Sequence, residues 1–575
     1  MTGHDAGYAR ARSTRWGAPS TNGDVTETTR LLGSVADELH SQAGRDVWVG
    51  AEDFKGFPWW RRPSVYWLLA PWFLFILAFG GTLVPKVNLI VDLVCREYFA
   101  DEAARNHDLV VLPIVLGGDN DQCKVAPVQQ LATKIQLIMN LIVGLLSAVI
   151  APKLGQLSDM YGRTRWLALS SAGGLVAEVV TILAAKFPDT INYRWIILGS
   201  VFDGLSGSFT AGNILSHSYT SDCTPPSRRG VAIGYIHACL FTGLALGPVL
   251  AGYFVKATGS LVSIFYVTLG CHAFFALFAL LVMPESVSRR RQLLSREKHA
   301  KELAERTDDG SWLGALRHRN PFAPLQILYK KQPGAPPLFR RNVICLAVID
   351  MILMGAAMGA GNCIIMYTRL VFGWNTFESS KYVSAVSTVR ALVLLVVFPV
   401  INYVFRTRPA AMRARNLGAG SVVERNKGAD GLDIWLIRLA LVSDVLGATG
   451  YLLARNSALF VVGGIVTAVG GLGSATIQAS VTKHVPPDTV GQLLGAVGLL
   501  HALARVLSPL AFSGVYWATL ATYPQAIFVL LVGLYGLSLL GSLLVRPHVY
   551  LRDDADSPAG AGSEEGSPGE EERLL

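Results

Sequence analysis

The eleven residues Gly155-Gln-Leu-Ser-Asp-Met-Tyr-Gly-Arg-Thr-Arg165 connect two long apolar segments of this 575-residue chain. Gly155 and Gly162 flank a single acidic residue, Asp159, and two basic residues, Arg163 and Arg165, follow it. Glycine permits a tight turn and a close approach of helices, and a carboxylate satisfies exposed N–H groups at the start of a neighbouring helix. The segment therefore predicts a releasable charged clasp between helices. The alternative, that the charges only hold the loop on one side of a membrane, leaves the two glycines unexplained.

The composition is that of a membrane protein. The chain is 51% hydrophobic and only 16% charged, and its mean hydropathy is +0.40. A membrane-spanning helix needs about 20 apolar residues, and such segments recur from Trp67 to Val545. We expect an all-α membrane protein of about twelve helices, which begin near residues 66, 130, 166, 193, 229, 260, 342, 380, 433, 457, 490 and 525.

The positive residues predict the orientation. The net charge of +9 comes from Lys and Arg in short segments between the apolar stretches, which indicates membrane topology rather than nucleic-acid binding. Both termini and the basic segment 285–341 are expected in the cytosol. The first loop on the opposite side is acidic and holds Cys95 and Cys123, which could form a disulfide or remain free thiols.

A repeat divides the chain into two halves. Pro225, Gly230, Gly234 and Pro248 correspond to Pro486, Gly491, Gly495 and Pro509 with one offset, since 486 − 225 and 509 − 248 both equal 261. Parallel repeats place a substrate site between the halves near the middle of the bilayer. We expect a disordered cytosolic N-terminal tail (1–60), a six-helix half (61–284), a cytosolic basic linker (285–341), a second six-helix half (342–548) and a disordered acidic C-terminal tail (549–575).

The segment from Gly155 to Arg165 resembles the signature loop of the major facilitator superfamily. Pro284-Glu285-Ser286 also resembles the end of the first half in that superfamily. The resemblance covers roughly residues 60–548, and it implies two pseudo-symmetric six-helix halves that act as a transporter. It also implies that the clasp meets the start of the eleventh helix, near Gly491.

Residues in the fifth and fourth predicted helices indicate which branch of the superfamily the chain resembles. Residues Gly243, Gly247, Pro248 and Gly252 resemble the glycine-proline motif of proton-driven drug antiporters, and glycines at these intervals let helices pack closely. Asp203 stands where drug antiporters usually carry an Arg. The chain therefore resembles proton-coupled folate carriers and tetracycline-efflux proteins more closely, as a fungal-type member.

Ionisable residues inside the apolar segments are candidates for proton or substrate binding, because each costs a few kcal/mol in the bilayer unless it is paired or lines an aqueous cavity. We select Asp203 and Arg505 first, followed by four weaker candidates: Glu178, Asp350, Arg390 and Asp444. A fixed ion pair between helices is the alternative role. His217, His237, His272 and His501 are interpreted as packing residues, although His237 and His501 lie on helices that commonly line a cavity.

Both tails carry an acidic residue four positions before a pair of leucines, which resembles sorting signals read by cytosolic adaptors. The two motifs are Glu27 with Leu31-Leu32 and Glu570 with Leu574-Leu575. They favour a vacuolar or endolysosomal membrane over the plasma membrane.

The predicted function is secondary active transport of a small solute by alternating access, coupled to protons. The expected partners are the solute, protons and the lipid bilayer. The chain has no Walker-type glycine-rich loop and no metal-ligand or nucleophile motif, so we expect no cofactor, no metal and no enzymatic activity. The alternative is a nutrient sensor that keeps a transporter fold without transport.

Overall fold

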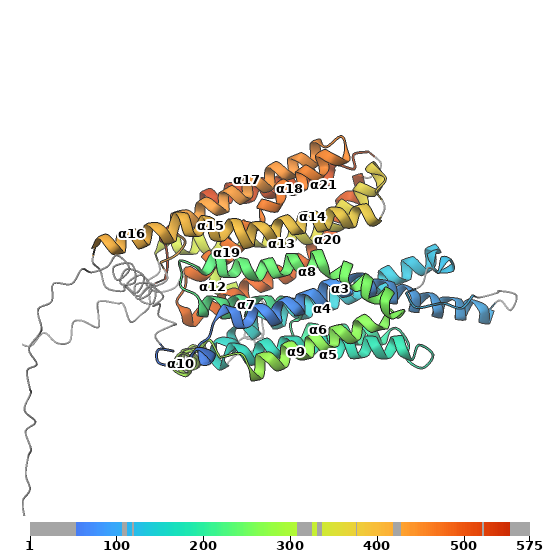
Figure 1. Cartoon of the computed structure of the whole chain (residues 1–575), viewed down its shortest axis with the longest axis horizontal. Helices are drawn as coiled ribbons and strands as arrows, with labels where there is room; N and C mark the ends of the chain where they lie inside the picture. Colours follow the sequence, from blue (N-terminus) through green and yellow to red (C-terminus); the bar gives the residue numbers. More distant parts are fainter. Residues whose placement is uncertain are drawn as a thin grey trace, which may run out of the picture.

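The computed structural model describes residues 53–105, 112–117, 120–306, 325–329, 336–374, 376–417, 427–519 and 522–551. The regular elements in these ranges are all helices, and the ranges contain no strand. Figure 1 shows an elongated bundle of long helices that run roughly side by side. The two predicted sorting motifs lie outside the described residues.

The N-terminal half begins with a short 3-10 turn, Trp59–Arg61, and a second 3-10 turn, Asp121–Lys124, precedes α4. Its helices are α3 (Val65–Arg105), α4 (Ala126–Tyr161), α5 (Arg163–Lys186), α6 (Trp195–Leu205), α7 (Ser208–Cys223), α8 (Arg229–Thr258) and α9 (Val262–Leu281).

The C-terminal half begins with α13 (Pro337–Phe372). The next crossing is a chain of short elements: α14 (Thr376–Leu392), a π-helical turn (Val393–Val397), α15 (Phe398–Asn402), a second π-helical turn (Tyr403–Thr407) and α16 (Arg408–Leu417). The half ends with α17 (Gly431–Leu453), α18 (Ser457–Val469), α19 (Gly471–Lys483), a 3-10 turn (Pro487–Thr489), α20 (Val490–Thr519) and α21 (Ala526–Leu543).

Eleven helical segments in the described ranges are long and apolar enough to cross a bilayer. The fourth predicted helix is interrupted, because α6 ends at Leu205 and α7 begins at Ser208. Gly207 between them has φ +83°, a conformation that favours glycine. Together α6 and α7 supply the twelfth crossing, which agrees with the predicted number. α18 and α19 meet at Gly470 at the corresponding place in the C-terminal half.

The bundle has two ends of different character. The Arg-rich connections and the starts of α5, α8, α13 and α20 lie at one end, which we call the basic face. At the other end, which we call the disulfide face, Cys95 and Cys123 are disulfide-bonded with Cα atoms 5.4 Å apart. Beside the disulfide, the Asp92 carboxylate accepts hydrogen bonds from Gly117 N (2.7 Å) and the Asn120 amide (3.2 Å).

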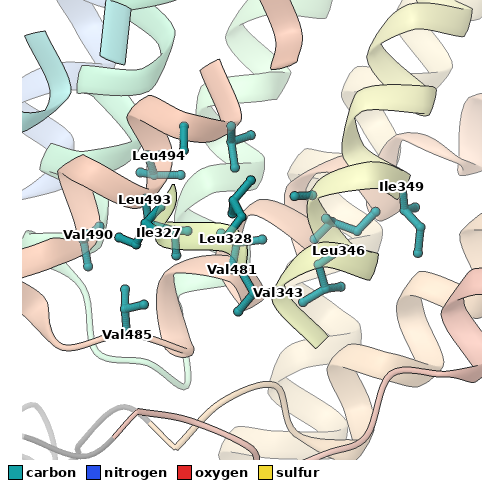
Figure 2. Close-up of a cluster of buried hydrophobic side chains, with 14 of the residues drawn as sticks. Ile327, Leu328, Val343, Leu346, Ile349, Val481, Val485, Val490, Leu493 and Leu494 are labelled. Carbon is teal, nitrogen blue, oxygen red and sulfur yellow. The ribbon is translucent and has the colours of Figure 1, made fainter. Parts of the chain in front are cut away.

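The linker between the halves is partly folded. α10 (Arg289–Arg306) and α12 (Gln326–Tyr329) both lie within it. Ile327 and Leu328 of α12 are buried in a cluster with Val343, Val481 and Leu493 from α13, α19 and α20 (Figure 2). The same cluster includes Ala151 and Ile214 of the N-terminal half, so it is also apolar packing between the halves.

The folded C-terminal half extends beyond its predicted boundary at residue 548. His548 N donates to Ala429 O (2.9 Å), and Leu551 N donates to His484 O (2.8 Å). These backbone bonds attach residues 549–551 to the end of α19 and the start of α17, so the first three residues of the predicted C-terminal tail belong to the fold.

Glycines of the fifth-helix motif create the close contact between α3 and α8. A Cβ atom added to Gly247 would lie 2.6 Å from Gly81 N, and one added to Gly243 would lie 2.6 Å from the Ile76 side chain. Gly252 differs, because an added Cβ would meet no atom within 4 Å. Gly243 and Gly247 therefore determine the spacing of these helices, whereas Gly252 does not.

We predict that Gly247→Val lowers the thermal stability of the purified protein by about 1–3 kcal/mol or prevents folding, because two valine methyl groups cannot fit against the α3 backbone. Gly252→Val is the matched control on the same helix and should melt like the wild type. Equal melting temperatures for the two variants would contradict the assigned packing.

Candidate functional site: the inter-half clasp and the buried charges

The predicted clasp lies on the basic face, at the junction between α4 and α20. Asp159 is buried near the end of α4, and its carboxylate accepts hydrogen bonds from Gly491 N (3.2 Å) and Gln492 N (2.9 Å) in the first turn of α20. Those N–H groups have no partner within their own helix, and the start of a helix attracts negative charge. Asp159 thus attaches the N-terminal half to the C-terminal half.

The two glycines of the motif have different roles. Gly155 lies within α4, where an added Cβ would be 2.5 Å from Gly491 O, so the missing side chain lets α4 and α20 approach. Gly162 forms the turn between α4 and α5 with φ +97°, and an added Cβ would be 2.5 Å from the Glu285 carboxylate.

Arg163 is fully buried at the centre of the clasp. Its guanidinium contacts Asp159 at 2.5 Å and Asp222 at 2.9 Å, and it donates to Ser158 Oγ at 2.6 Å. The Glu285 carboxylate accepts hydrogen bonds from the backbone N–H groups of Arg163 (2.7 Å) and Thr164 (3.1 Å), at the start of α5. Arg165, the second basic residue of the motif, is exposed, and no carboxylate among the described residues forms an ion pair with it.

The linker helix α10 reinforces the clasp. Arg291 donates to Asp222 (3.3 Å) in the N-terminal half and to Pro487 O (3.0 Å) in the C-terminal half. Arg296 donates to Met160 O (2.8 Å), and its guanidinium lies 4.4 Å from the centroid of the Tyr161 ring. α10 therefore spans the junction at which the halves meet.

A second charged cluster lies at the corresponding place in the C-terminal half, with the signs of the charges inverted. Asp433 of α17 contacts Lys483 of α19 at 2.5 Å and Arg406 at 2.7 Å. Lys483 follows Asp222 by the repeat offset, because 483 − 222 equals 261. Arg406 also donates to Ser227 O (2.8 Å), just before α8. One cluster is therefore an arginine between two aspartates, and the other is an aspartate between two cations.

Three groups of charged residues lie deeper in the bundle. In the first, Lys86 of α3 is 3.7 Å from Glu178 of α5, and Asp203 of α6 accepts a hydrogen bond from Ser208 Oγ (2.8 Å). Asp203 is within electrostatic range of Lys86 and of Arg505 from the other half. Glu178, Asp203 and Arg505 are thus brought together, and Lys86 joins them.

The second group is centred on Asp350 of α13. His501 Nε2 is 2.8 Å from one Asp350 oxygen, and the Gln478 amide is 3.5 Å from the other. The ring centroids of His217 and His237 lie 5.1 Å apart on the neighbouring helices of the N-terminal half. His501, interpreted from the sequence as a packing residue on a helix that commonly lines a cavity, is therefore also the hydrogen-bond partner of a candidate carboxylate.

The third group, Arg390 and Asp444, lies apart from the first two. The Arg390 guanidinium is 5.2 Å from the centroid of the Phe241 ring, across the contact between α14 and α8. Asp444 packs against Gly470 at the junction of α18 and α19. The six candidate carboxylates and guanidiniums thus form three separate groups rather than one site.

A small cavity lies between the halves beside the first two groups. Three helices line it, each with residues on one face: Phe209, Thr210 and Asn213 of α7, Met354 and Met358 of α13, and His501 and Arg505 of α20. This cavity is a candidate binding site at the interface between the repeats.

The family model described as Major Facilitator Superfamily matches residues 125–423, more than half of the chain. The chain belongs to this superfamily. Its members are membrane transport proteins rather than enzymes, so this chain is a multi-pass membrane transporter of a small molecule.

Curated relatives extend the match along the chain. The MFS-type transporter avaJ of Aspergillus versicolor is 26% identical over 494 residues, which cover 86% of this chain and 90% of that protein. The class H tetracycline resistance protein of Pasteurella multocida is 23% identical and covers 71% and 84% of the two chains. The proton-coupled folate transporter of Bos taurus is 22% identical, with 71% and 77% covered.

Solved structures support the fold. The human organic anion transporter MFSD10 (TETRAN) superposes with a TM-score of 0.59 at 17% identity and covers 84% of this chain and 100% of that one. The proton:xylose symporter XylE has a TM-score of 0.51 at 14% identity, with 85% and 97% covered.

Sequence reasoning missed several members of these clusters. Lys86 is an isolated cation in a long apolar helix, a signal of the kind that selected Asp203. Asp222, Asp433 and Lys483 lie at helix ends, where charged residues are common, so nothing in the sequence distinguished them.

We predict that Asp159→Asn folds but shifts the molecule toward a conformation open on the basic face. The amide keeps the shape but loses charge-assisted bonds, which are worth about 1.5–3 kcal/mol, or roughly a tenfold or larger shift in the equilibrium. The measurement is the alkylation rate of a cysteine at Ala496, which is fully buried in α20.

The matched control is Asp488→Asn, which removes a carboxylate that is 3.2 Å from the exposed Lys298. An exposed pair contributes little, so this variant should be alkylated at the wild-type rate. An unchanged rate in Asp159→Asn would remove Asp159 from the gate.

Proposed function

We propose that this protein is a proton-coupled secondary transporter that works by alternating access, with its basic face in the cytosol. The observation that carries the proposal is the cavity between the halves, which has buried charges beside it and a charged closure at one end. A transporter of this type needs a central site and a releasable gate on each side.

The closure at the basic face suits a gate. Its polar contacts between the halves are hydrogen bonds at helix ends: Asp159 to Gln492 N, Arg291 to Pro487 O, and Arg406 to Ser227 O. Water can replace these contacts when the halves separate, and the apolar cluster that also joins the halves must separate with them. Arg163 also pairs with Asp222 within its own half, so it retains an ion-pair partner when the halves separate.

The coupling proposal assigns the proton to Asp203. Its carboxylate lies at the break between α6 and α7, where it accepts a hydrogen bond from Ser208, and Arg505 of the other half is within electrostatic range of it. A carboxylate whose distance from a cation changes as the halves move has a proton affinity that changes with the conformation. Proton uptake and release would then accompany each switch.

We predict that purified wild-type protein in lipid vesicles accumulates its solute when a pH gradient is imposed. Asp203→Asn should abolish this accumulation while leaving exchange at equal pH partly intact, because exchange moves no net proton. Asn still accepts the Ser208 hydrogen bond, so the variant should fold.

Asp444→Asn is the matched control, since Asp444 is also a buried carboxylate but lies outside the cavity group. It should change accumulation and exchange in equal proportion. If Asp203→Asn does the same, the residue only stabilises helix packing. A folded wild-type protein that moves none of a broad solute panel would contradict transport by this chain.

We also propose a vacuolar or endolysosomal location, on the basis of the two acidic dileucine motifs. Replacing Leu31, Leu32, Leu574 and Leu575 by Ala should redirect a fluorescent fusion to the plasma membrane. A fusion whose location does not change would show that these leucines do not act as sorting signals.

A further inference from the structure

We infer that the cavity between the halves binds organic anions, specifically a carboxylate attached to a flat apolar body; this inference rests on the proposed transport function and names its substrate class. The argument starts from the residues that line the cavity. Its polar residues are the cation Arg505 and three residues with hydrogen-bonding side chains, His501, Asn213 and Thr210, and no carboxylate is among the lining residues.

Among the residues that line the cavity, Arg505 has a donor left for a ligand. Its Nη1 atom is buried, and it has no hydrogen-bond partner among the described residues. No described carboxylate lies within the 4.0 Å limit for an ion pair with this guanidinium. A guanidinium at this depth is costly unless an anion compensates it, and its planar donors match a carboxylate in a bidentate arrangement.

The nearby carboxylates are already engaged. Asp350 pairs with His501 at 2.8 Å, and Asp203 accepts the Ser208 hydroxyl at 2.8 Å. Both lie outside the lining of the cavity, so a ligand there meets the cation first. This arrangement disfavours a cationic ligand, which would approach Arg505 without a facing carboxylate.

The apolar residues that line the cavity determine which apolar part of a ligand can fit beside Arg505. The Phe209 ring is stacked on Phe79, with centroids 5.3 Å apart and planes inclined by 12°. Trp72 extends the stack, with its centroid 6.3 Å from that of Phe209. The stacking holds Phe209 as a flat surface, while the thioethers of Met354 and Met358 can adapt to ligands of different outline.

The experiment compares matched ligands on the full-length protein in lipid nanodiscs. The probes are benzoate, 2-naphthoate and indole-3-acetate, each beside its primary amide and the corresponding amine, and the readouts are Kd and the shift in melting temperature. The carboxylates should bind about tenfold or more tightly than their amides, because only they form the charged bond with Arg505, and the amines should be weakest.

Arg505→Gln should remove the preference for carboxylate over amide, and Arg505→Lys should retain part of it, since a charge without the planar fork remains. Arg390→Gln is the matched control, because Arg390 is a partly buried arginine whose Nε also lacks a hydrogen-bond partner among the described residues, and it does not line the cavity. This control should retain the full wild-type preference.

Several results would overturn the inference: equal binding of carboxylates and amides, preference for amines, no binding by any carboxylate of the series, or a preference that survives Arg505→Gln. Even if Arg505→Gln fails to fold, the comparison of carboxylates with amides on the wild-type protein still tests the inference. Counterflow of the same nine compounds in vesicles separates the two proposals. Movement of only amides or amines would leave transport intact and refute the anion site, whereas carboxylate binding without movement would refute transport and retain the site.

Discussion

The burial of Arg163 is the constraint on which the basic face depends. A fully buried guanidinium is strongly unfavourable unless carboxylates and further hydrogen bonds surround it. Asp159, Asp222 and Ser158 supply these partners, and Asp159 uses its remaining capacity on the first N–H groups of α20. The ion pair within one half is therefore connected directly to the contact between the halves. Gly155 and Gly491 let α4 and α20 come close enough for this contact.

The inverted cluster around Asp433 gives the repeat a physical meaning. The duplicated halves retain helix packing and the positions of their glycines, yet the central charge is positive in one half and negative in the other. Each cluster still pairs its central charge with two opposite charges. A cation between two carboxylates and a carboxylate between two cations can both form such pairs. The inversion also lets each half use a different backbone partner. Asp159 accepts hydrogen bonds from N–H groups at a helix start, whereas Arg406 donates a hydrogen bond to the Ser227 carbonyl.

The charges at mid-depth follow a different arrangement. Asp350 has a close partner in His501, but Lys86 and Glu178 are 3.7 Å apart and Arg505 has a buried nitrogen without a partner. Incomplete pairing is costly inside a membrane, and it occurs here beside the cavity between the halves. The central site thus has a donor left to bind a solute.

The sequence by itself determined the membrane class, the twelve crossings, the two-half repeat and the clasp motif, because each depends on a local pattern. The length of an apolar segment indicates a membrane-spanning helix, and a constant offset between similar residues indicates a duplication. The spacing of Gly, Asp, Gly and Arg indicates a tight turn that carries charged side chains. It also singled out Asp203, Asp350 and Arg505, since a charge in an apolar segment is visible without a partner. Only the tertiary structure showed that these residues belong to separate groups, that Lys86 and His501 join them, and that Asp222, Asp433 and Lys483 are buried. The physical reason is that burial and pairing are properties of helices brought together from distant parts of the chain, and a single helix does not specify which neighbour its charged residue will meet.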